Sequence, residues 1–281
     1  MTLRESLEVA TSLLQRKGIE RARLETEWIA AHVLGLNRLE LCLNLERPLQ
    51  ASERTVLQRL IQRRSTREPL AYVLGAIPFD TLELKSDQRA LVPRPETEEL
   101  IDLLGRECRF SSEPLQILDL GTGCGAIALA LASRFPRAHV TAVDASPDAL
   151  ALACENVRAC NLNKRVQLQQ SDWFEAVAGR FDVIVANPPY LSESEWQTAE
   201  PEVREHEPRC ALVAEQEGAA ALLHILQAAP AYLKAHGLLA LETGIDHHAL
   251  LKVVADEVGY VRSRSYKDLS GRDRHFLAWV G

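Results

Sequence analysis

The alternation of strand-like and helix-like segments after residue 113 constrains the fold of this 281-residue chain most strongly. Short strand-like segments occur at residues 116–120, 139–143, 166–169, 181–186 and 237–242. Helical patterns alternate with them, at about residues 126–133, 147–159, 218–235 and 247–257, and segments 260–266 and 275–280 resemble a closing strand pair. Because short connections between alternating strands and helices favour parallel pairing, we expect an α/β fold with a doubly wound, mostly parallel sheet.

The first 76 residues show helical periodicity and no strand-like alternation. Thr2 and Glu5 have the spacing of a capping box, and apolar residues follow at helical spacing until Gly18. We expect further helices over about residues 22–33 and 52–64, with a short one within 36–45. The sequence therefore predicts a separate N-terminal helical bundle over residues 1–76.

The periodicity changes at Ile77, where a strand-like alternation runs to Leu84. Turn residues follow at 85–88, and a short apolar run returns at 90–92. We therefore expect a β-hairpin linker over residues 77–95. A new helix should open at about residues 96–104, and the second domain should cover residues 96–281.

Composition and charge exclude several function classes. Hydrophobic residues make up 47% of the chain and charged residues 25%, which excludes a disordered or fibrous protein. No apolar run approaches the ~18 residues that a membrane span needs, and the first residues resemble no secretory or transit peptide. We therefore expect a cytoplasmic protein with no membrane partner. Residues 78–281 hold 20 Lys and Arg against 30 Asp and Glu, a balance that disfavours a direct grip on nucleic acid.

Cysteine and histidine spacing gives no sign of a metal site. The six cysteines are scattered, none forms a Cys-x-x-Cys pair, and no His-Glu-x-x-His motif occurs. We expect reduced thiols that fill small apolar spaces, and no bound metal.

A glycine-rich turn joins the first strand of the alternating region to its helix. It reads Gly121-Thr122-Gly123-Cys124-Gly125, and Asp144 ends the next strand. Glycines allow a tight turn and a close backbone approach to a ligand, and an acid at the end of the second strand can accept both ribose hydroxyls of a nucleoside. This spacing also fits the relaxed dehydrogenase fingerprint, so a nicotinamide cofactor remains an alternative at this point.

Two further observations favour a different nucleoside cofactor. Asp119 precedes the first glycine by two residues, where a carboxylate would meet a cationic amino-acid group and repel a pyrophosphate. The glycine turn also resembles the first motif of S-adenosylmethionine (SAM) methyltransferases. In that resemblance the loop after the third strand flanks the adenine, with Asp172 near the exocyclic amine and Trp173 as an apolar wall.

The motif Asn187-Pro188-Pro189-Tyr190 leaves the carboxyl end of the buried strand 181–186. Two successive prolines stiffen the loop and remove two backbone donors, so the loop offers acceptors: the Asn187 side-chain oxygen and the Pro188 carbonyl, beside the flat ring of Tyr190. Such acceptors suit a planar NH₂ group, because they hold its hydrogens and stabilise the positive charge that develops during methyl transfer. Both an amide and an aromatic amino group meet this description.

Segments spread over nearly the whole chain resemble the release factor N5-glutamine methyltransferases (the PrmC/HemK family). They are Arg67-Glu68-Pro69-Leu70-Ala71-Tyr72 with Gly75, Leu91-Val92-Pro93-Arg94-Pro95-Glu96-Thr97-Glu98, Asn187-Pro188-Pro189-Tyr190, and Glu207-Pro208 followed by Ala211-Leu212. The resemblance implies a Rossmann-like, seven-stranded SAM-dependent methyltransferase domain behind a helical substrate-recognition domain. The implied substrate is the glutamine of the Gly-Gly-Gln loop in bacterial class 1 release factors, and we expect the enzyme to be a monomer.

The same resemblance assigns roles to individual residues. Asn187 and Pro188 would be catalytic, and residues 187–190 would hold the glutamine. The implied SAM contacts are Gly121, Thr122, Gly123, Cys124, Gly125, Asp144, Asp172, Trp173 and Asn187.

Two alternatives remain open at this point. Adenine-N6 and guanine-N2 methyltransferases, which act on DNA or RNA, use closely similar loops in which the tyrosine stacks on an extruded base. The acidic second domain, the lack of a second nucleic-acid module and the helical N-terminal domain favour a protein substrate. A catalytically silent SAM-binding module is the other alternative, and the presence of both Asn187 and Asp144 counts against it.

Overall fold

The computed structural model describes residues 1–108 and 114–281, and residues 109–113 lie outside the described part. The chain divides into two compact units. The first comprises Met1–Ala76 together with Glu200–His206, and the second comprises Ile77–Ala199 and Glu207–Gly281. The division proposed from the sequence, with boundaries at residues 76 and 95, remains a prediction.

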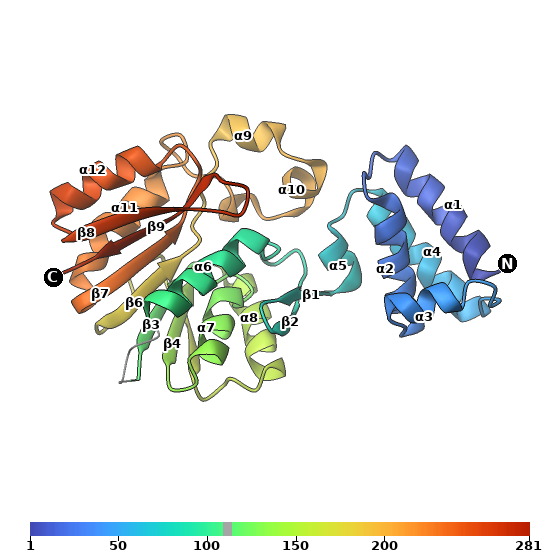
Figure 1. The fold of residues 1–281 in the computed structure, drawn as a ribbon, viewed down its shortest axis with the longest axis horizontal. Coiled ribbons are helices and arrows are strands. Elements are labelled where there is room, and N and C mark those ends of the chain that lie inside the picture. Colours follow the sequence, from blue (N-terminus) through green and yellow to red (C-terminus); the bar gives the residue numbers. More distant parts are fainter. Residues whose placement is uncertain (109–113) are drawn as a thin grey trace. The chain divides into compact units, whose positions relative to one another are not determined.

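The first unit is a small helical bundle (Figure 1). Its N-terminal helices are α1 (Leu3–Arg16), α2 (Ala22–Leu34), α3 (Arg38–Leu43), α4 (Ala51–Ser65) and α5 (Leu70–Leu74). The predicted capping box is present, because Thr2 Oγ1 accepts from the Glu5 amide at 3.2 Å and Glu5 Oε2 accepts from the Thr2 amide at 2.8 Å. Leu7, Ile29 and Leu57 share the buried core of the bundle.

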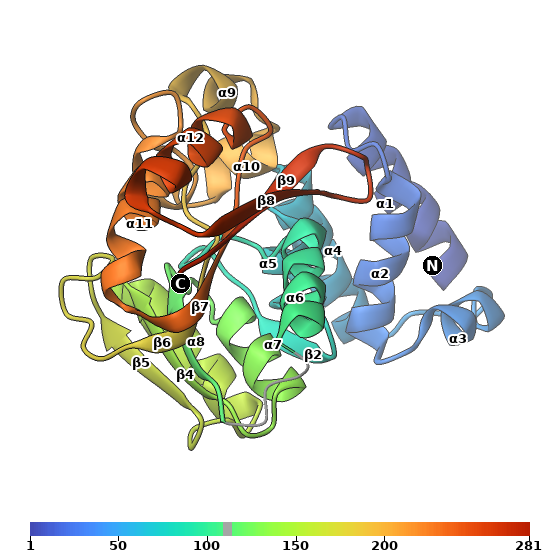
Figure 2. The same ribbon diagram turned by 60° about the vertical axis from the view of Figure 1, so that its left-hand side comes forward.

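The second unit is built on a seven-stranded sheet with the order β5-β4-β3-β6-β7-β9-β8 (Figure 2). The strands are β3 (Gln116–Leu120), β4 (His139–Asp144), β5 (Val166–Gln170), β6 (Phe181–Ala186), β7 (Leu233–Glu242), β8 (Arg262–Lys267) and β9 (Asp273–Trp279). Strands β3 to β7 pair in parallel, and β9 runs antiparallel to both β7 and β8. The predicted doubly wound α/β sheet with a closing strand pair is confirmed.

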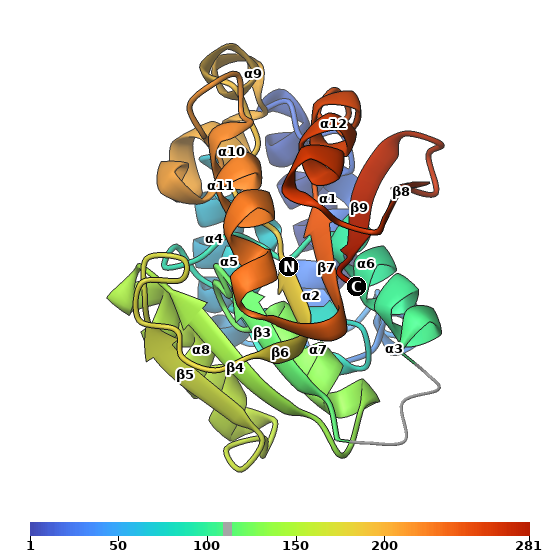
Figure 3. The same cartoon turned by 90° about the vertical axis from the view of Figure 1, so that its left-hand side faces the viewer.

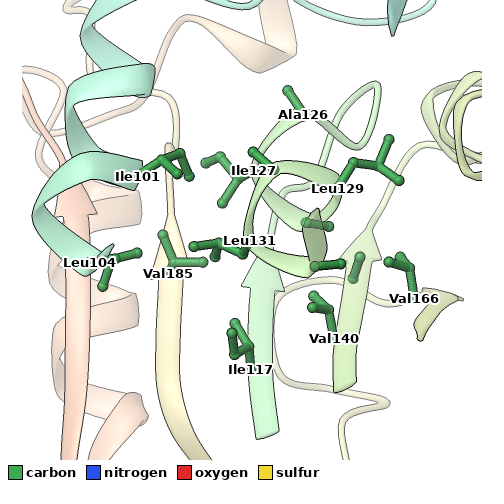
Figure 4. Close-up of a cluster of buried hydrophobic side chains, with 14 of the residues drawn as sticks. Ile101, Leu104, Ile117, Ala126, Ile127, Leu129, Leu131, Val140, Val166 and Val185 are labelled. Atoms are coloured by element: carbon green, nitrogen blue, oxygen red, sulfur yellow. The ribbon is translucent and has the colours of Figure 1, made fainter. Parts of the chain in front are cut away.

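Helices cover both faces of this sheet (Figure 3). One face carries α6 (Pro95–Glu107), α7 (Ala126–Arg134) and α8 (Pro147–Ala159), and the other carries α11 (Ala220–Ala228) and α12 (His248–Val258). Figure 4 shows Val185 of β6 between Leu104 of α6 and Leu131 of α7, and Ile117 of β3 belongs to the same buried cluster. Because both faces are buried, the central strands read as continuous apolar runs.

The predicted linker hairpin is present, but its strands and its turn lie at other residues than expected. The structure pairs β1 (Ala76–Phe79) with β2 (Leu82–Lys85), so the chain turns at residues 80–81, inside the segment predicted to be one strand, and residues 90–92 form no strand. Phe79 and Leu84 are 1% and 0% exposed. These residues are five apart and would face opposite sides of one continuous strand, whereas the turn lets both enter the core. Asp80 turns the chain with a φ of 51°, a conformation that aspartate tolerates.

The predicted helix at residues 218–235 is shorter than expected. The helix α11 ends at Ala228, a 3₁₀ turn follows at Ala229–Ala231, and β7 begins at Leu233. Pro230 explains the early end, because proline lacks the amide donor that would continue the α-helical hydrogen bonds. The segment between β6 and α11 holds α9 (Glu193–Thr198), α10 (Pro201–His206) and a 3₁₀ turn at Arg209–Ala211. The sequence predicted none of these three elements.

Candidate active site

The candidate site lies at the carboxyl ends of the parallel strands in the second unit. Strand β4 pairs along one edge of β3, and β6 pairs along its other edge. The strand order therefore reverses at β3, which makes this point a topological switch. Open α/β sheets bind ligands at such a crevice. A cavity of about 220 Å³ opens there, lined from both sides of the switch. Its walls include Gly121, Thr122, Gly123, Cys124, Asp144, Asp172, Trp173, Asn187, Pro188 and Pro189.

Residues 121–124 of the glycine turn between β3 and α7 line this cavity, whereas Gly125 is not among the described residues that do so. All three glycines have positive φ angles, of 68°, 57° and 89° at Gly121, Gly123 and Gly125. Cβ-bearing residues rarely adopt this conformation, so the glycines account for the tightness of the turn. The Cys124 carbonyl accepts from Asn156 Nδ2 at 2.9 Å, which ties the turn to α8. Burial raises the pKa of the Cys124 thiol to about 12.

Asp144 is fixed at the cavity by two backbone donors. Its Oδ2 accepts from the Gly123 amide at 2.8 Å and its Oδ1 from the Ser146 amide at 2.9 Å. Burial raises the pKa of this carboxyl. Because a carboxylate has about four lone-pair sites, each oxygen keeps the capacity to accept a hydroxyl from a ligand.

Asp119 does not line the cavity, in contrast to the position expected from the sequence. The side chain is fully buried beneath the glycine turn, where its Oδ2 accepts from Thr122 Oγ1 at 2.6 Å and from the Ala128 amide at 3.1 Å. Its Oδ1 finds no hydrogen-bond partner within the described part of the chain. Burial raises the pKa of Asp119 to about 7. The residue therefore ties β3 to the start of α7.

The loop after β5 supplies an aromatic wall. Trp173 has a φ of 44°, which is uncommon for a residue with a bulky side chain. Ser171 Oγ holds this backbone by donating to the Trp173 carbonyl at 2.9 Å. A Cβ placed on Gly121 would lie 3.6 Å from the Trp173 ring, so the indole packs against the glycine turn. Asp172 lines the cavity beside it.

The Asn187–Pro189 backbone brings β6 to the same cavity, whereas Tyr190 turns away from it. Asn187, Pro188 and Pro189 line the cavity, and Tyr190 is not among the described residues that do so. The Tyr190 hydroxyl donates to Glu242 Oε1 at 3.2 Å. Burial raises the pKa of Tyr190. The predicted flat ring is therefore directed to Glu242 and does not line the cavity.

Two further residues that line the cavity, Thr97 and Arg94, were given no role in the sequence analysis. Thr97 donates to Glu242 Oε2 at 2.6 Å and accepts from Asn187 Nδ2 at 3.2 Å. Arg94 lines the cavity and forms an ion pair with Glu207, whose pKa burial raises. Thr97 and Arg94 both belong to the segment 91–98, so the family resemblance was the signal that could have singled them out.

Comparison with known proteins identifies the family. Residues 5–75 match the model of the PrmC N-terminal domain, and residues 100–203 match that of the methyltransferase small domain. The release factor glutamine methyltransferase of Geobacter sulfurreducens is 38% identical, over 97% of this chain and 95% of its own length. The Rhodopirellula baltica protein of the same name is 37% identical, over 97% and 94%.

This chain belongs to the release factor glutamine methyltransferase family. Membership makes it a methyltransferase and confirms the predicted resemblance. Among solved structures, the 16S rRNA N2 methyltransferase of T. thermophilus, in complex with AdoMet and guanosine, superposes with a TM-score of 0.53. It is 20% identical, over 73% of this chain and 50% of its own, so this likeness shows the fold alone.

The described residues contain neither a candidate membrane-spanning helix nor a candidate metal-binding cluster. Within residues 1–108 and 114–281, no helix is both long and apolar enough to cross a membrane. Over the same ranges, no group of three or more His, Cys, Asp or Glu side chains is placed to hold a metal ion.

Proposed function

We propose that this chain transfers the methyl group of S-adenosylmethionine to the side-chain amide nitrogen of the glutamine in the Gly-Gly-Gln loop of bacterial class 1 release factors. The observation that carries the proposal is the shared cavity: the acceptor loop at Asn187 and Pro188 opens onto the same space as the glycine turn and Asp144. The names of the relatives support the choice of a release factor glutamine over a nucleic-acid base.

The residues around the cavity fit the cofactor. Asp144 keeps free lone pairs for the two ribose hydroxyls, and Trp173 offers an apolar surface for the adenine ring. The open backbone of the glycine turn leaves room for close approach, and Asp172 would accept from the exocyclic amine. When bound, S-adenosylmethionine supplies an electrophilic methyl group on a positively charged sulfur.

The acceptor loop would perform the chemistry by orientation and charge. The Asn187 side-chain oxygen and the Pro188 carbonyl accept the two N–H bonds of the glutamine amide, which directs the nitrogen lone pair toward the methyl group. An amide nitrogen is delocalised and weakly nucleophilic. The two acceptors stabilise the positive charge that develops on it during transfer. No strong base is needed, because the nitrogen loses its extra proton after the methyl group arrives.

The wider assignments rest on the same proposal. Residues 1–76 would recognise the release factor, and their match to the PrmC N-terminal domain model supports this role. We propose that the protein works as a monomer in the cytoplasm, where a translation factor would be its partner.

Two substitutions with crossed effects test the proposal. Asn187→Ala removes one acceptor, so the turnover number should fall ~10²–10³-fold while SAM affinity stays within about twofold. Asp144→Ala should instead weaken SAM binding in a calorimetric titration. Wild-type turnover in Asn187→Ala would contradict the acceptor mechanism, and unchanged titration of Asp144→Ala would contradict the ribose assignment.

A further inference from the structure

A buried chain of hydrogen bonds stands behind the acceptor loop. Thr97, near the start of α6, and Glu242, at the end of β7, are 3% and 0% exposed. Thr97 joins Glu242 at 2.6 Å and Asn187 at 3.2 Å, and Tyr190 joins Glu242 from the other side at 3.2 Å. Both the first and the last residue of the Asn187–Tyr190 motif are therefore connected to one carboxylate.

Each hydroxyl group has a single proton to donate, and this limit fixes which group donates in each of these hydrogen bonds. The two carboxyl oxygens of Glu242 accept from Thr97 and from Tyr190, so each of these residues uses its single hydroxyl proton in the bond to Glu242. The Thr97 oxygen then has lone pairs alone to offer Asn187. It can pair with the NH₂ group of the Asn187 amide but cannot donate to its carbonyl oxygen.

This direction decides which end of the Asn187 side chain faces Thr97. The two ends of an amide are nearly equal in shape, so packing alone does not distinguish them. The hydrogen bond to Thr97 holds Nδ2 on the Thr97 side, which leaves Oδ1 free to accept from another group. A reversed amide would present a donor where the proposed reaction needs an acceptor.

Groups around Glu242 shift its pKa in opposite directions. Burial raises the pKa of Glu242, while the hydrogen bonds from Thr97 and Tyr190 and the positive charge of Arg274 act in the opposite direction. Arg274 is held in place by a 3.0 Å hydrogen bond to the Thr243 carbonyl, next to Glu242 in the chain.

We propose that Thr97 and Glu242 are positioning residues, which hold the Asn187 amide with its oxygen directed toward the substrate. The inference rests on the proposed function, because it assigns the orientation of the acceptor used there. Neither residue needs to touch the substrate: Glu242 orients Thr97, and Thr97 orients Asn187.

The test compares Thr97→Val with Thr97→Ser. Valine keeps the shape of threonine and removes the hydroxyl, so it frees the Asn187 amide to rotate. We measure turnover number and KM for methyl transfer from SAM to a purified class 1 release factor, together with SAM affinity by calorimetric titration. Thr97→Val should lower the turnover number by about 10–100-fold, the range expected when a reacting group is misplaced, with SAM affinity within about twofold. Thr97→Ser restores the hydroxyl and should recover the rate to within about threefold of the wild type.

Each outcome bears on a separate claim. Wild-type turnover in Thr97→Val, or an equal loss in Thr97→Ser, would overturn the positioning role. Failure of the wild-type protein to methylate the release factor would instead contradict the proposed function. Should Thr97→Val not fold, Thr97→Cys takes its place, because a thiol is close in size and a weak hydrogen-bond donor. The same loss of rate is then expected, and wild-type turnover would again overturn the proposal.

Discussion

Asn187 shows how much of a site residue's chemistry is set by neighbours that are distant in sequence. The residue type and its position after β6 follow from the sequence, and they indicate an acceptor. The orientation of its amide depends on Thr97 and Glu242, which are 145 residues apart and meet where α6 packs beside β7. No rule on residue spacing relates two positions so far apart in the sequence, so only the structure reveals that they form a pair.

Asp119 gives a prediction about pH at the residue scale. Its pKa is about 7 in the folded protein, against 3.8 for an ordinary aspartate. A folded-state pKa above the unfolded value means that this residue contributes most to stability below pH 3.8. The contribution is lost as the pH rises toward 7. Asp119→Asn removes this titration, so the variant should gain stability relative to the wild type between pH 4 and pH 8, by up to a few kcal/mol.

Urea unfolding of both proteins at several pH values measures this difference. The comparison isolates Asp119, because Asp144, Glu207 and Glu242 titrate in both proteins. A free-energy difference between variant and wild type that stays constant from pH 4 to pH 8 would show that Asp119 ionises normally.

At the scale of elements, the turn before α11 supports the acceptor loop directly. Gly218 has a φ of 84°, and a Cβ placed on it would lie 2.1 Å from the Tyr190 carbonyl oxygen. Backbone atoms cannot give way as a flexible side chain can, so Gly218→Ala must displace the loop that holds Asn187. We expect a loss of about 3 kcal/mol in stability and at least a tenfold loss of turnover.

Gly179→Ala is the matched control for this substitution. Gly179 has a φ of 94° in the same unit, and a Cβ there would meet no atom within 4 Å. Gly179→Ala should lower the stability by the backbone strain alone, about 1–2 kcal/mol, and leave turnover near the wild-type value. Urea unfolding and initial rates on both variants make the comparison, and equal effects would refute a supporting role for Gly218.

Elements were predicted well where periodicity decides them and poorly where tertiary packing does. The central strands β3, β6 and β7 are mostly apolar because they are buried, and these runs were recognised. The turn at residues 80–81 has no glycine or proline, and it exists because Phe79 and Leu84 both enter one core. The short helices between Tyr190 and Ala211 are partly polar and bury little surface, so their periodicity gave no signal.

At the scale of the whole molecule, the segment Glu200–His206 belongs with the helical bundle although it follows the acceptor loop by ten residues. Glu202 joins this segment to the bundle, since its carboxylate pairs with Arg64 at 2.8 Å and with Arg67 at 2.6 Å. Arg64 is 5% exposed and also pairs with Glu25 at 2.5 Å. Through these ion pairs, a segment from the second half of the chain contributes to the fold of the first unit.

Glu202→Gln should therefore destabilise the first unit by about 2 kcal/mol, because it weakens hydrogen bonds to two charged partners of low exposure. Glu205→Gln on the same helix is the control: its pair with Arg204 is 53% and 38% exposed and should contribute less than about 1 kcal/mol. Calorimetric unfolding measures both, and SAM titration should be unaffected in either variant. Equal stability of the two variants would show that Glu202 does not anchor the segment.

The most direct measurement of the central claim is the position of the transferred methyl group. Purified protein is incubated with S-adenosylmethionine and a bacterial class 1 release factor, and the product is mapped by peptide mass spectrometry. The account predicts a single added methyl group on the glutamine of the Gly-Gly-Gln loop, absent when Asn187→Ala replaces the wild-type enzyme. No methyl group on that glutamine, with transfer to DNA or ribosomal RNA in parallel reactions, would contradict it.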